Sequence, residues 1–176
     1  AREVNPNAQL YGIELSSGAA AVAEHFGQVF QADMLTIDKP ELLDKFDYIF
    51  MGDVLEHIVD TDGALAKVYS WLKKGGQLIV SVPNIANISI ITNMLMGKWH
   101  YVDSGILDKT HMRFFTYKEM VKNLTRHNLA IKKSAYSHLN FESPAPELRE
   151  ALLNLPFIKV APQDLDAFQW VFVAEK

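Results

Sequence analysis

An almost unbroken apolar segment, Phe46-Asp47-Tyr48-Ile49-Phe50-Met51, is the part of this sequence that is most informative about its fold. Strands of this composition are typical of parallel sheets whose two faces are both covered by helices. We therefore expect a central strand here. Shorter apolar runs at residues 9–15 and 29–32, before this segment, and at 77–82, after it, predict further strands.

Helical patterns alternate with these runs. Helices are predicted at residues 17–26, 63–72, 88–97 and 116–127, and in a stretch around 147–155, while residues 129–136 and 168–174 are predicted to be strands. This alternation predicts an α/β fold with a mostly parallel sheet and right-handed crossovers. Length favours one domain over residues 1–176, because 176 residues fall within the usual size of a single domain.

Composition narrows the classes of partner. The chain has 17 basic and 21 acidic side chains, a net charge of -4 and no long run of Lys or Arg, so we expect no nucleic-acid partner. It has no cysteine and no apolar run long enough to span a bilayer. We expect a cytoplasmic protein without a membrane partner.

Candidate binding residues come from the ends of the predicted strands, because ligands of open α/β sheets bind beyond the carboxyl ends of the strands. Glu14 ends the first strand, and its carboxylate offers two acceptor oxygens, as the paired hydroxyls of a ribose require. Asp33 follows the second strand and could accept from an adenine amino group, with Met34 against the purine face. The alternatives are that Glu14 caps the next helix, that Asp33 opens a turn and that Met34 fills the core.

The third and fourth predicted strands end in polar positions too. Gly52-Asp53 ends the third and Pro83-Asn84 ends the fourth. His57 follows the third strand closely and is the best candidate for a general base, since an imidazole accepts a proton near neutral pH. The alternative is a solvated His, or one bonded to Glu56.

His111 is a second candidate base, and Arg113 is a candidate contact for an acidic or hydroxylated substrate; each could equally be a surface residue. We expect no metal site. The adjacent pair Glu56-His57 lacks the one-face spacing of a helical metal motif.

Four segments together resemble class I S-adenosylmethionine-dependent methyltransferases, in the branch that methylates small metabolites, quinone precursors and sugars. They are Tyr11-Gly12-Ile13-Glu14-Leu15-Ser16, Gln31-Ala32-Asp33-Met34, the run from Phe46 through Asp53-Val54-Leu55-Glu56-His57, and Leu72-Lys73-Lys74-Gly75-Gly76-Gln77-Leu78. The stretch His111-Met112-Arg113-Phe114-Phe115-Thr116 is similar to the segment that closes over the active site in that branch. A dinucleotide-binding oxidoreductase is disfavoured because its glycine fingerprint is missing.

The resemblance implies a Rossmann-like sheet with an antiparallel last strand and S-adenosyl-L-methionine as cofactor. Glu14 with Leu15 would bind the ribose, Asp33 and Met34 the adenine, and Gly52 and Asp53 the methionine end. Substrate contacts would come from Asn84, Tyr101, Arg113 and Phe114, with Trp99 and Phe141 as further walls. Residues 84–115 would form a substrate loop or lid, and 137–166 an insertion before the last strand.

The resemblance also implies that this chain lacks the first strand of the family's sheet. Family members begin with a strand and a glycine-rich turn at the cofactor, whereas residues 1–4 of this chain resemble the end of the helix that follows them. We expect an N-terminally truncated domain that binds the cofactor weakly, with direct pairing of the flanking strands or a homodimer as alternatives.

The function expected for the intact parent protein is methyl transfer to a small-molecule acceptor, through an oxygen nucleophile on a sugar or small metabolite. The alternative is a non-catalytic Rossmann-like scaffold or partner-binding module.

Overall fold

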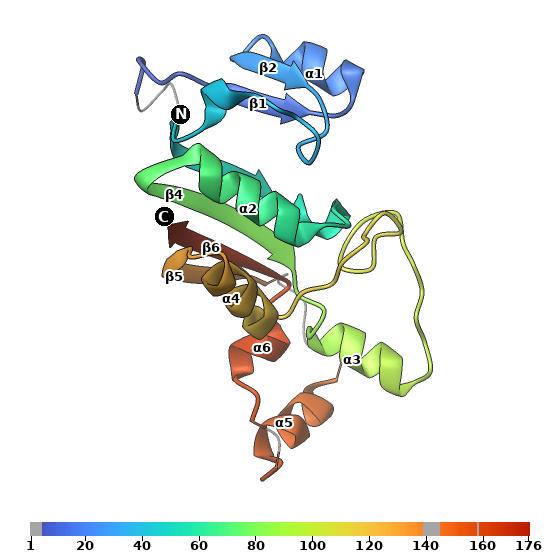
Figure 1. The fold of residues 1–176 in the computed structure, drawn as a ribbon. Coiled ribbons are helices and arrows are strands. Elements are labelled where there is room, and N and C mark those ends of the chain that lie inside the picture. The colour runs from blue at the N-terminus through green and yellow to red at the C-terminus, as the bar shows by residue number, and fades with distance from the viewer. Residues whose placement is uncertain (1–4, 139–144, 158) are drawn as a thin grey trace. The chain divides into compact units, whose positions relative to one another are not determined.

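The structure is a computed structural model that describes residues 5–138, 145–157 and 159–176 (Figure 1). The chain divides into two compact units, Ala1–Glu41 and Leu42–Lys176, which are described separately below. A 3-10 turn, η1 (Pro40–Leu42), lies where they meet in the sequence. The predicted helix end at residues 1–4 and the predicted wall residue Phe141 lie outside the described residues.

The first unit is a strand, a helix and a strand, as the sequence predicted. It contains β1 (Tyr11–Glu14), α1 (Ser17–Ala23) and β2 (Gln28–Gln31). The two strands pair in parallel, with Glu14 opposite Gln31. Ser16 caps α1, because its hydroxyl accepts a hydrogen bond from the Ala19 amide and so satisfies one free donor of the first turn.

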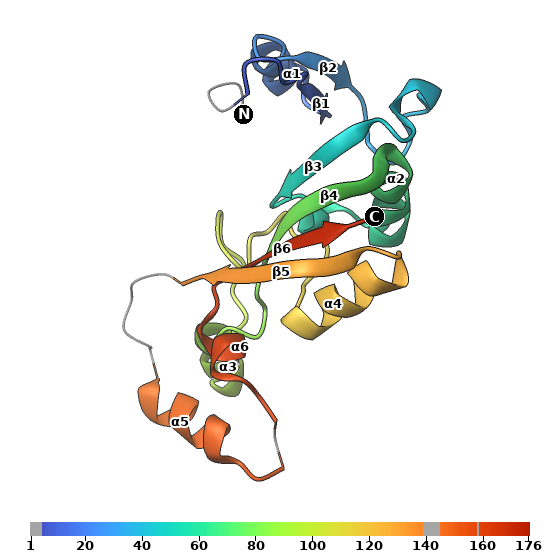
Figure 2. The same ribbon diagram turned by 90° about the vertical axis from the view of Figure 1, so that its left-hand side faces the viewer.

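The second unit is a four-stranded sheet with helices and a long loop. Its elements are β3 (Phe46–Gly52), η2 (Leu55–His57), α2 (Thr61–Trp71), β4 (Leu72–Pro83), α3 (Ile88–Leu95), α4 (Tyr117–Arg126), β5 (Ala130–Ser137), α5 (Pro146–Asn154), α6 (Pro162–Asp166) and β6 (Gln169–Glu175). The strand order is β3-β4-β6-β5, which can be followed from top to bottom in Figure 2. β3 and β4 are parallel, while β6 runs antiparallel to both of its neighbours. The predicted antiparallel last strand is confirmed.

The core of this unit lies between one face of the sheet and two helices. The strand register places Met51 beside Val80 and Val80 beside Phe172, and all three are buried. Helices α2 and α4 both cover this face (Figures 1 and 2), and they contribute the fully buried Leu65, Val68, Met120 and Leu124. Alternate residues of each strand therefore form the core.

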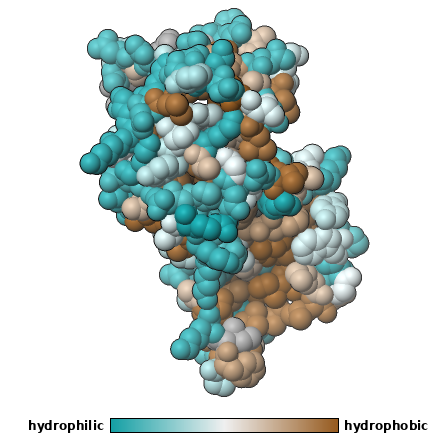
Figure 3. Space-filling model, in the orientation of Figure 1, coloured by the Kyte–Doolittle hydropathy of each residue, from teal (hydrophilic) through white to brown (hydrophobic). Residues whose placement is uncertain are grey.

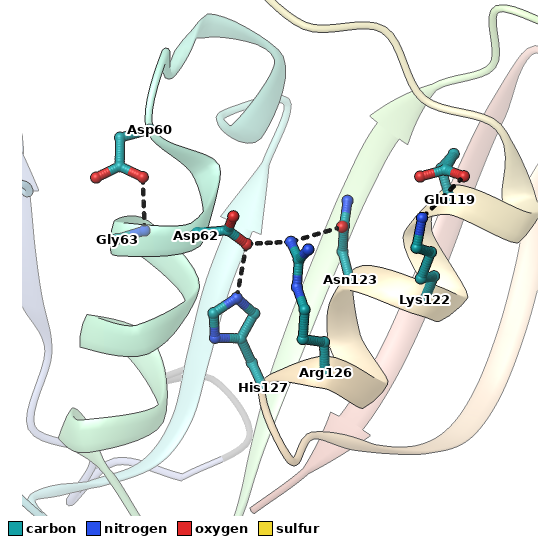
Figure 4. A network of polar contacts seen from close by, with 8 residues as sticks. All are labelled: Asp60, Asp62, Gly63, Glu119, Lys122, Asn123, Arg126 and His127. Atoms are coloured by element: carbon teal, nitrogen blue, oxygen red, sulfur yellow. Dashed lines mark hydrogen bonds and ion pairs between the residues drawn. The ribbon is translucent and has the colours of Figure 1, made fainter.

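A polar network joins α2 to the end of α4 (Figure 4). Asp62, in the first turn of α2, accepts hydrogen bonds from Arg126 and from His127, the latter at 2.9 Å. Arg126 also donates to Asn123 at 3.2 Å. These contacts connect α2 and α4 on their solvent-exposed side, away from the buried apolar residues.

The expectation that β3 is a central strand covered on both faces is wrong for the sheet that contains it. β3 is an edge strand, and its Tyr48 and Phe50 side chains are 67% and 74% exposed. The reason is the pairing: β1 and β2 form a separate two-stranded sheet, and among the described residues no strand pairs with the free edge of β3. None of the helices in the described part of the chain combines the length and the apolar character that crossing a bilayer requires.

Candidate functional site

Two carboxylates lie at the carboxyl edge of the β1–β2 sheet. Glu14 ends β1 opposite Gln31, and Asp33 follows β2 two residues later. Each carboxylate is oriented by one local hydrogen bond: Glu14 Oε1 accepts from the Ser16 amide at 2.8 Å, and Asp33 Oδ1 accepts from the Leu35 amide at 2.8 Å. One oxygen of each group is thus held by the backbone. Beside them, Leu15 is exposed and Met34 is half-buried.

At the end of β3, Asp53 has a backbone conformation that is unusual for a residue with a side chain. Its φ is 53°, in the left-handed region, where Asp is tolerated better than most residues. Its amide donates to Ser81 Oγ at 3.2 Å, and its carboxylate accepts from the Gln169 side chain. β3, β4 and β6 together fix this residue just after Gly52, where the sequence predicted a ligand contact.

The long loop after α3 returns to η2 and is held there by the backbone. The carbonyl of Glu56 accepts hydrogen bonds from the amides of Met112 at 2.7 Å and Arg113 at 3.0 Å. Arg113 also donates through its guanidinium to the carbonyl of Val59 at 2.6 Å. The end of this loop is therefore fixed beside Leu55–His57.

This attachment brings together the two histidines that the sequence singled out. The rings of His57 and His111 meet edge to face, with centroids 4.8 Å apart. His57 Nδ1 lies 3.3 Å from the carbonyl oxygen of Thr110, and His111 Nδ1 lies 3.0 Å from that of Ile106. A carbonyl only accepts, so in the neutral rings Nδ1 carries the proton and Nε2 has the free lone pair. His57 is the last residue of η2.

Glu56 is the residue of this site whose importance the sequence did not reveal. Its side chain is only 1% exposed, and within the described residues neither carboxylate oxygen has a hydrogen-bond partner. Burial raises the pKa of Glu56 to about 7, and the nearby Asp53 carboxylate adds to the rise. Buried acids are nearly always paired, so Glu56 is a candidate for a functional role.

Glu56, His57 and His111 form one cluster of potential metal ligands. One ligand atom from each residue lies within 4.8 Å of the other two. Glu56 and His57 lack the spacing of a metal motif along one helix, but the third potential ligand, His111, comes from the loop. No local pattern joins His111 to Glu56-His57, so only the folded chain shows this grouping.

A row of aromatic side chains in the same loop leads to His111. The ring of Trp99 lies 5.8 Å from that of Phe114 and 6.4 Å from that of Tyr101, and Phe114 lies 6.4 Å from His111. Ile106 and Leu107 of the loop form a small buried cluster with Ile90 of α3. The predicted substrate residue Phe114 thus lies next to His111, and Trp99 links it to Tyr101. Contact of Tyr101 and Phe114 with a substrate stays a prediction.

Asn84 is placed differently from the other predicted substrate residues. It is fully buried, and its side-chain amide donates to the carbonyls of Asp164 at 2.8 Å and Ala167 at 2.9 Å. Its own carbonyl accepts from the Ala86 amide at 3.1 Å. In this structure Asn84 links the end of β4 to α6.

Comparisons with known proteins agree with this architecture. A family model described as a methyltransferase domain matches residues 1–134. Phosphoethanolamine N-methyltransferase 2 of Caenorhabditis elegans is 26% identical over 152 residues, which are 82% of this chain and 31% of that protein. Ubiquinone biosynthesis O-methyltransferase of Rhodopseudomonas palustris is 26% identical over 134 residues, which are 73% of this chain and 52% of that protein. The chain thus spans a minor part of the first relative and about half of the second.

A solved structure of an S-adenosylmethionine-dependent methyltransferase from Archaeoglobus fulgidus matches with a TM-score of 0.63 and 14% identity, over 94% of this chain and 75% of that one. At 14% sequence identity, this similarity is evidence for a shared fold only. Together with the family match, it confirms the resemblance that the strand ends suggested. The chain belongs to the methyltransferase-domain family, and its fold is that of the class I methyltransferases that use S-adenosylmethionine.

Proposed function

We propose that the protein containing this chain transfers the methyl group of S-adenosylmethionine to an oxygen nucleophile on a sugar or another small metabolite. The two relatives named above are, by their names, an N-methyltransferase of phosphoethanolamine and an O-methyltransferase of ubiquinone biosynthesis, and so support a small-molecule acceptor. The observation that carries the proposal is the group at the end of β3, where Asp53 is fixed in a left-handed conformation and is followed by His57 beside His111.

The residues assigned to the cofactor fit its polar groups. In the first unit, the Glu14 carboxylate can accept hydrogen bonds from the two ribose hydroxyls, and the Asp33 carboxylate can accept one from the adenine amino group. Leu15 and Met34 supply apolar surface beside them. In the second unit, the Asp53 carboxylate following Gly52 matches the ammonium of the methionine end. The bound cofactor supplies the electrophilic methyl group.

The chain's own contribution to the reaction is to align the acceptor and to receive its proton. His57 is suited to this, because the Thr110 carbonyl holds its Nδ1 and leaves Nε2 free to accept the proton. Trp99, Tyr101 and Phe114 form the neighbouring surface against which the acceptor would lie. Alignment of nucleophile and methyl group then accounts for much of the rate.

The experiment is transfer of isotope-labelled methyl from S-adenosylmethionine to small-molecule extracts and candidate acceptors by the full-length protein. We expect labelled small-molecule product with the wild type and with His100→Ala, which removes an exposed histidine of the same loop, and much less with His57→Ala. Cofactor binding without transfer to any acceptor would favour a scaffold or partner-binding module. An unchanged rate in His57→Ala would remove His57 as the base but would leave the methyltransferase assignment intact.

A further inference from the structure

The buried carboxylate of Glu56 is unexplained by the proposed reaction. It is 1% exposed, and neither of its oxygens has a hydrogen-bond partner in the described part of the chain. Burial of an unpaired carboxylate is costly unless a cation or a proton compensates it. Asp53, the acid near it, makes the environment more negative and so increases the need for a cation.

Two imidazoles lie beside this carboxylate, with one potential ligand atom of each residue within 4.8 Å of the others. Each has Nδ1 on a backbone carbonyl, His57 on Thr110 at 3.3 Å and His111 on Ile106 at 3.0 Å. Histidines that ligate metals are oriented in the same manner, with one ring N–H donating to a carbonyl or carboxylate and the other nitrogen on the ion.

Asp108 stabilises the orientation of His57 through the hydroxyl of Thr110. Thr110 Oγ1 donates to Asp108 Oδ1 at 2.6 Å, so that it can accept from His57 Nδ1, 3.2 Å away. The ring of His57 is therefore fixed by a carbonyl and by a hydroxyl whose own proton is already donated to Asp108. An outer layer of this kind sets both the tautomer and the orientation of a ligand.

We infer that Glu56, His57 and His111 bind a divalent first-row transition metal ion, for which Zn²⁺ is the probe. Their ligand atoms lie within 4.8 Å of one another, and two imidazoles with one carboxylate are a donor set that such ions prefer. Mg²⁺ prefers oxygen ligands and is not expected to bind here. Three protein ligands leave a coordination position open, as in catalytic and not in structural zinc sites.

The inference does not depend on methyl transfer, because binding is measured without cofactor or acceptor. It does change the role of one residue of the proposed reaction. With an ion bound, His57 would be a ligand and could not accept the proton, and the ion would instead lower the pKa of an acceptor hydroxyl at its open position, whose proton would pass to solvent. Inhibition of transfer by a chelator, reversed by Zn²⁺, would distinguish this from a metal-free base.

The test is calorimetric titration of the chelator-treated chain with Zn²⁺. We expect one Zn²⁺ ion to bind per chain, and millimolar Mg²⁺ not to compete with it. The affinity for Zn²⁺ should fall more than ~100-fold in His111→Ala and in Glu56→Gln, which exceeds the loss typical when a residue that only orients a ligand is replaced. His100→Ala, the exposed histidine of the same loop, should bind as the wild type does.

Thermal unfolding provides the second measurement. Zn²⁺ should raise the melting temperature of the wild type and of His100→Ala but not that of His111→Ala or Glu56→Gln. His111 is only partly buried, so its variant keeps the test valid should Glu56→Gln fold poorly. Absence of Zn²⁺ binding, or equal binding by the wild type and His111→Ala, would overturn the inference.

Discussion

The backbone carbonyl of Glu56 accepts the amide of Met112 at 2.7 Å, and this contact joins the turn after β3 to the end of a loop that is remote in the sequence. Its consequence is the pairing of His57 with His111, since each residue is a neighbour of one partner in that hydrogen bond. The candidate site of the second unit therefore depends on how the loop returns, as well as on the strand ends.

Replacement of His57 by Ala should lower the rate of methyl transfer by the full-length protein by ~10²–10⁴-fold, the usual contribution of a positioned acid or base. His111→Ala should lower it too, because the two rings are in contact. The measurement is the single-turnover rate with labelled cofactor, and His100→Ala is the control. Loss in His100→Ala equal to that in His57→Ala would contradict a specific role.

Glu14→Gln should weaken binding of S-adenosylhomocysteine by ~10–100-fold, because hydrogen bonds to a charged acceptor contribute about 1.5–3 kcal/mol. The substitution keeps the size of the side chain but removes the charge and one acceptor. Glu24→Gln, at the exposed C-cap of α1, is the matched control and should bind normally. Equal affinities for both variants, measured by calorimetry, would show that Glu14 does not hold the ribose.

Asn84→Ala should destabilise the second unit by about 2–4 kcal/mol, since it removes three hydrogen bonds and leaves the carbonyl of Asp164 without its Asn84 donor. Asn154→Ala, which removes an exposed amide on α5, should change the free energy of unfolding by less than ~0.5 kcal/mol. Chemical denaturation measures both. If Asn84→Ala is as stable as the wild type but binds the acceptor poorly, Asn84 acts as the sequence predicted, on the substrate.

Asp62→Asn should lower the free energy of unfolding at neutral pH, and the difference from the wild type should shrink in acid. Hydrogen bonding to His127, with Arg126 nearby, holds the pKa of Asp62 below its ordinary value of 3.8. A pKa that is lower in the folded state stabilises the protein above the unfolded-state pKa, and that stabilisation is lost as the pH falls through the folded-state pKa.

Denaturation over a pH series measures this effect, with Asp103→Asn as the control. Asp103 pairs with Lys109 inside one exposed loop, and such pairs contribute little. A difference between Asp62→Asn and the wild type that stays constant down to the start of acid unfolding would exclude the proposed contribution.

Much of the fold was predictable because strands and helices here follow their local patterns. The strand ends at Glu14, Gly52 and Pro83 occur where the apolar runs stop. Thr116, at the start of the helix predicted at 116–127, caps α4 by accepting from the Glu119 amide at 3.3 Å. Such features depend on a few adjacent residues.

Features set by distant contacts were not predictable. The edge position of β3 depends on which strands pair with it, and an apolar run does not encode its neighbours. The short helix α6 was missed, since five residues are too few for a periodic pattern. The burial of Glu56 and its proximity to His111 likewise arise only when the loop returns to η2.

The central claim is most directly tested by calorimetric titration of the full-length protein with S-adenosylhomocysteine. We predict saturable binding of one molecule per chain, competed by S-adenosylmethionine. Absence of binding under conditions in which the protein is folded would contradict the assignment of this chain to methyl transfer.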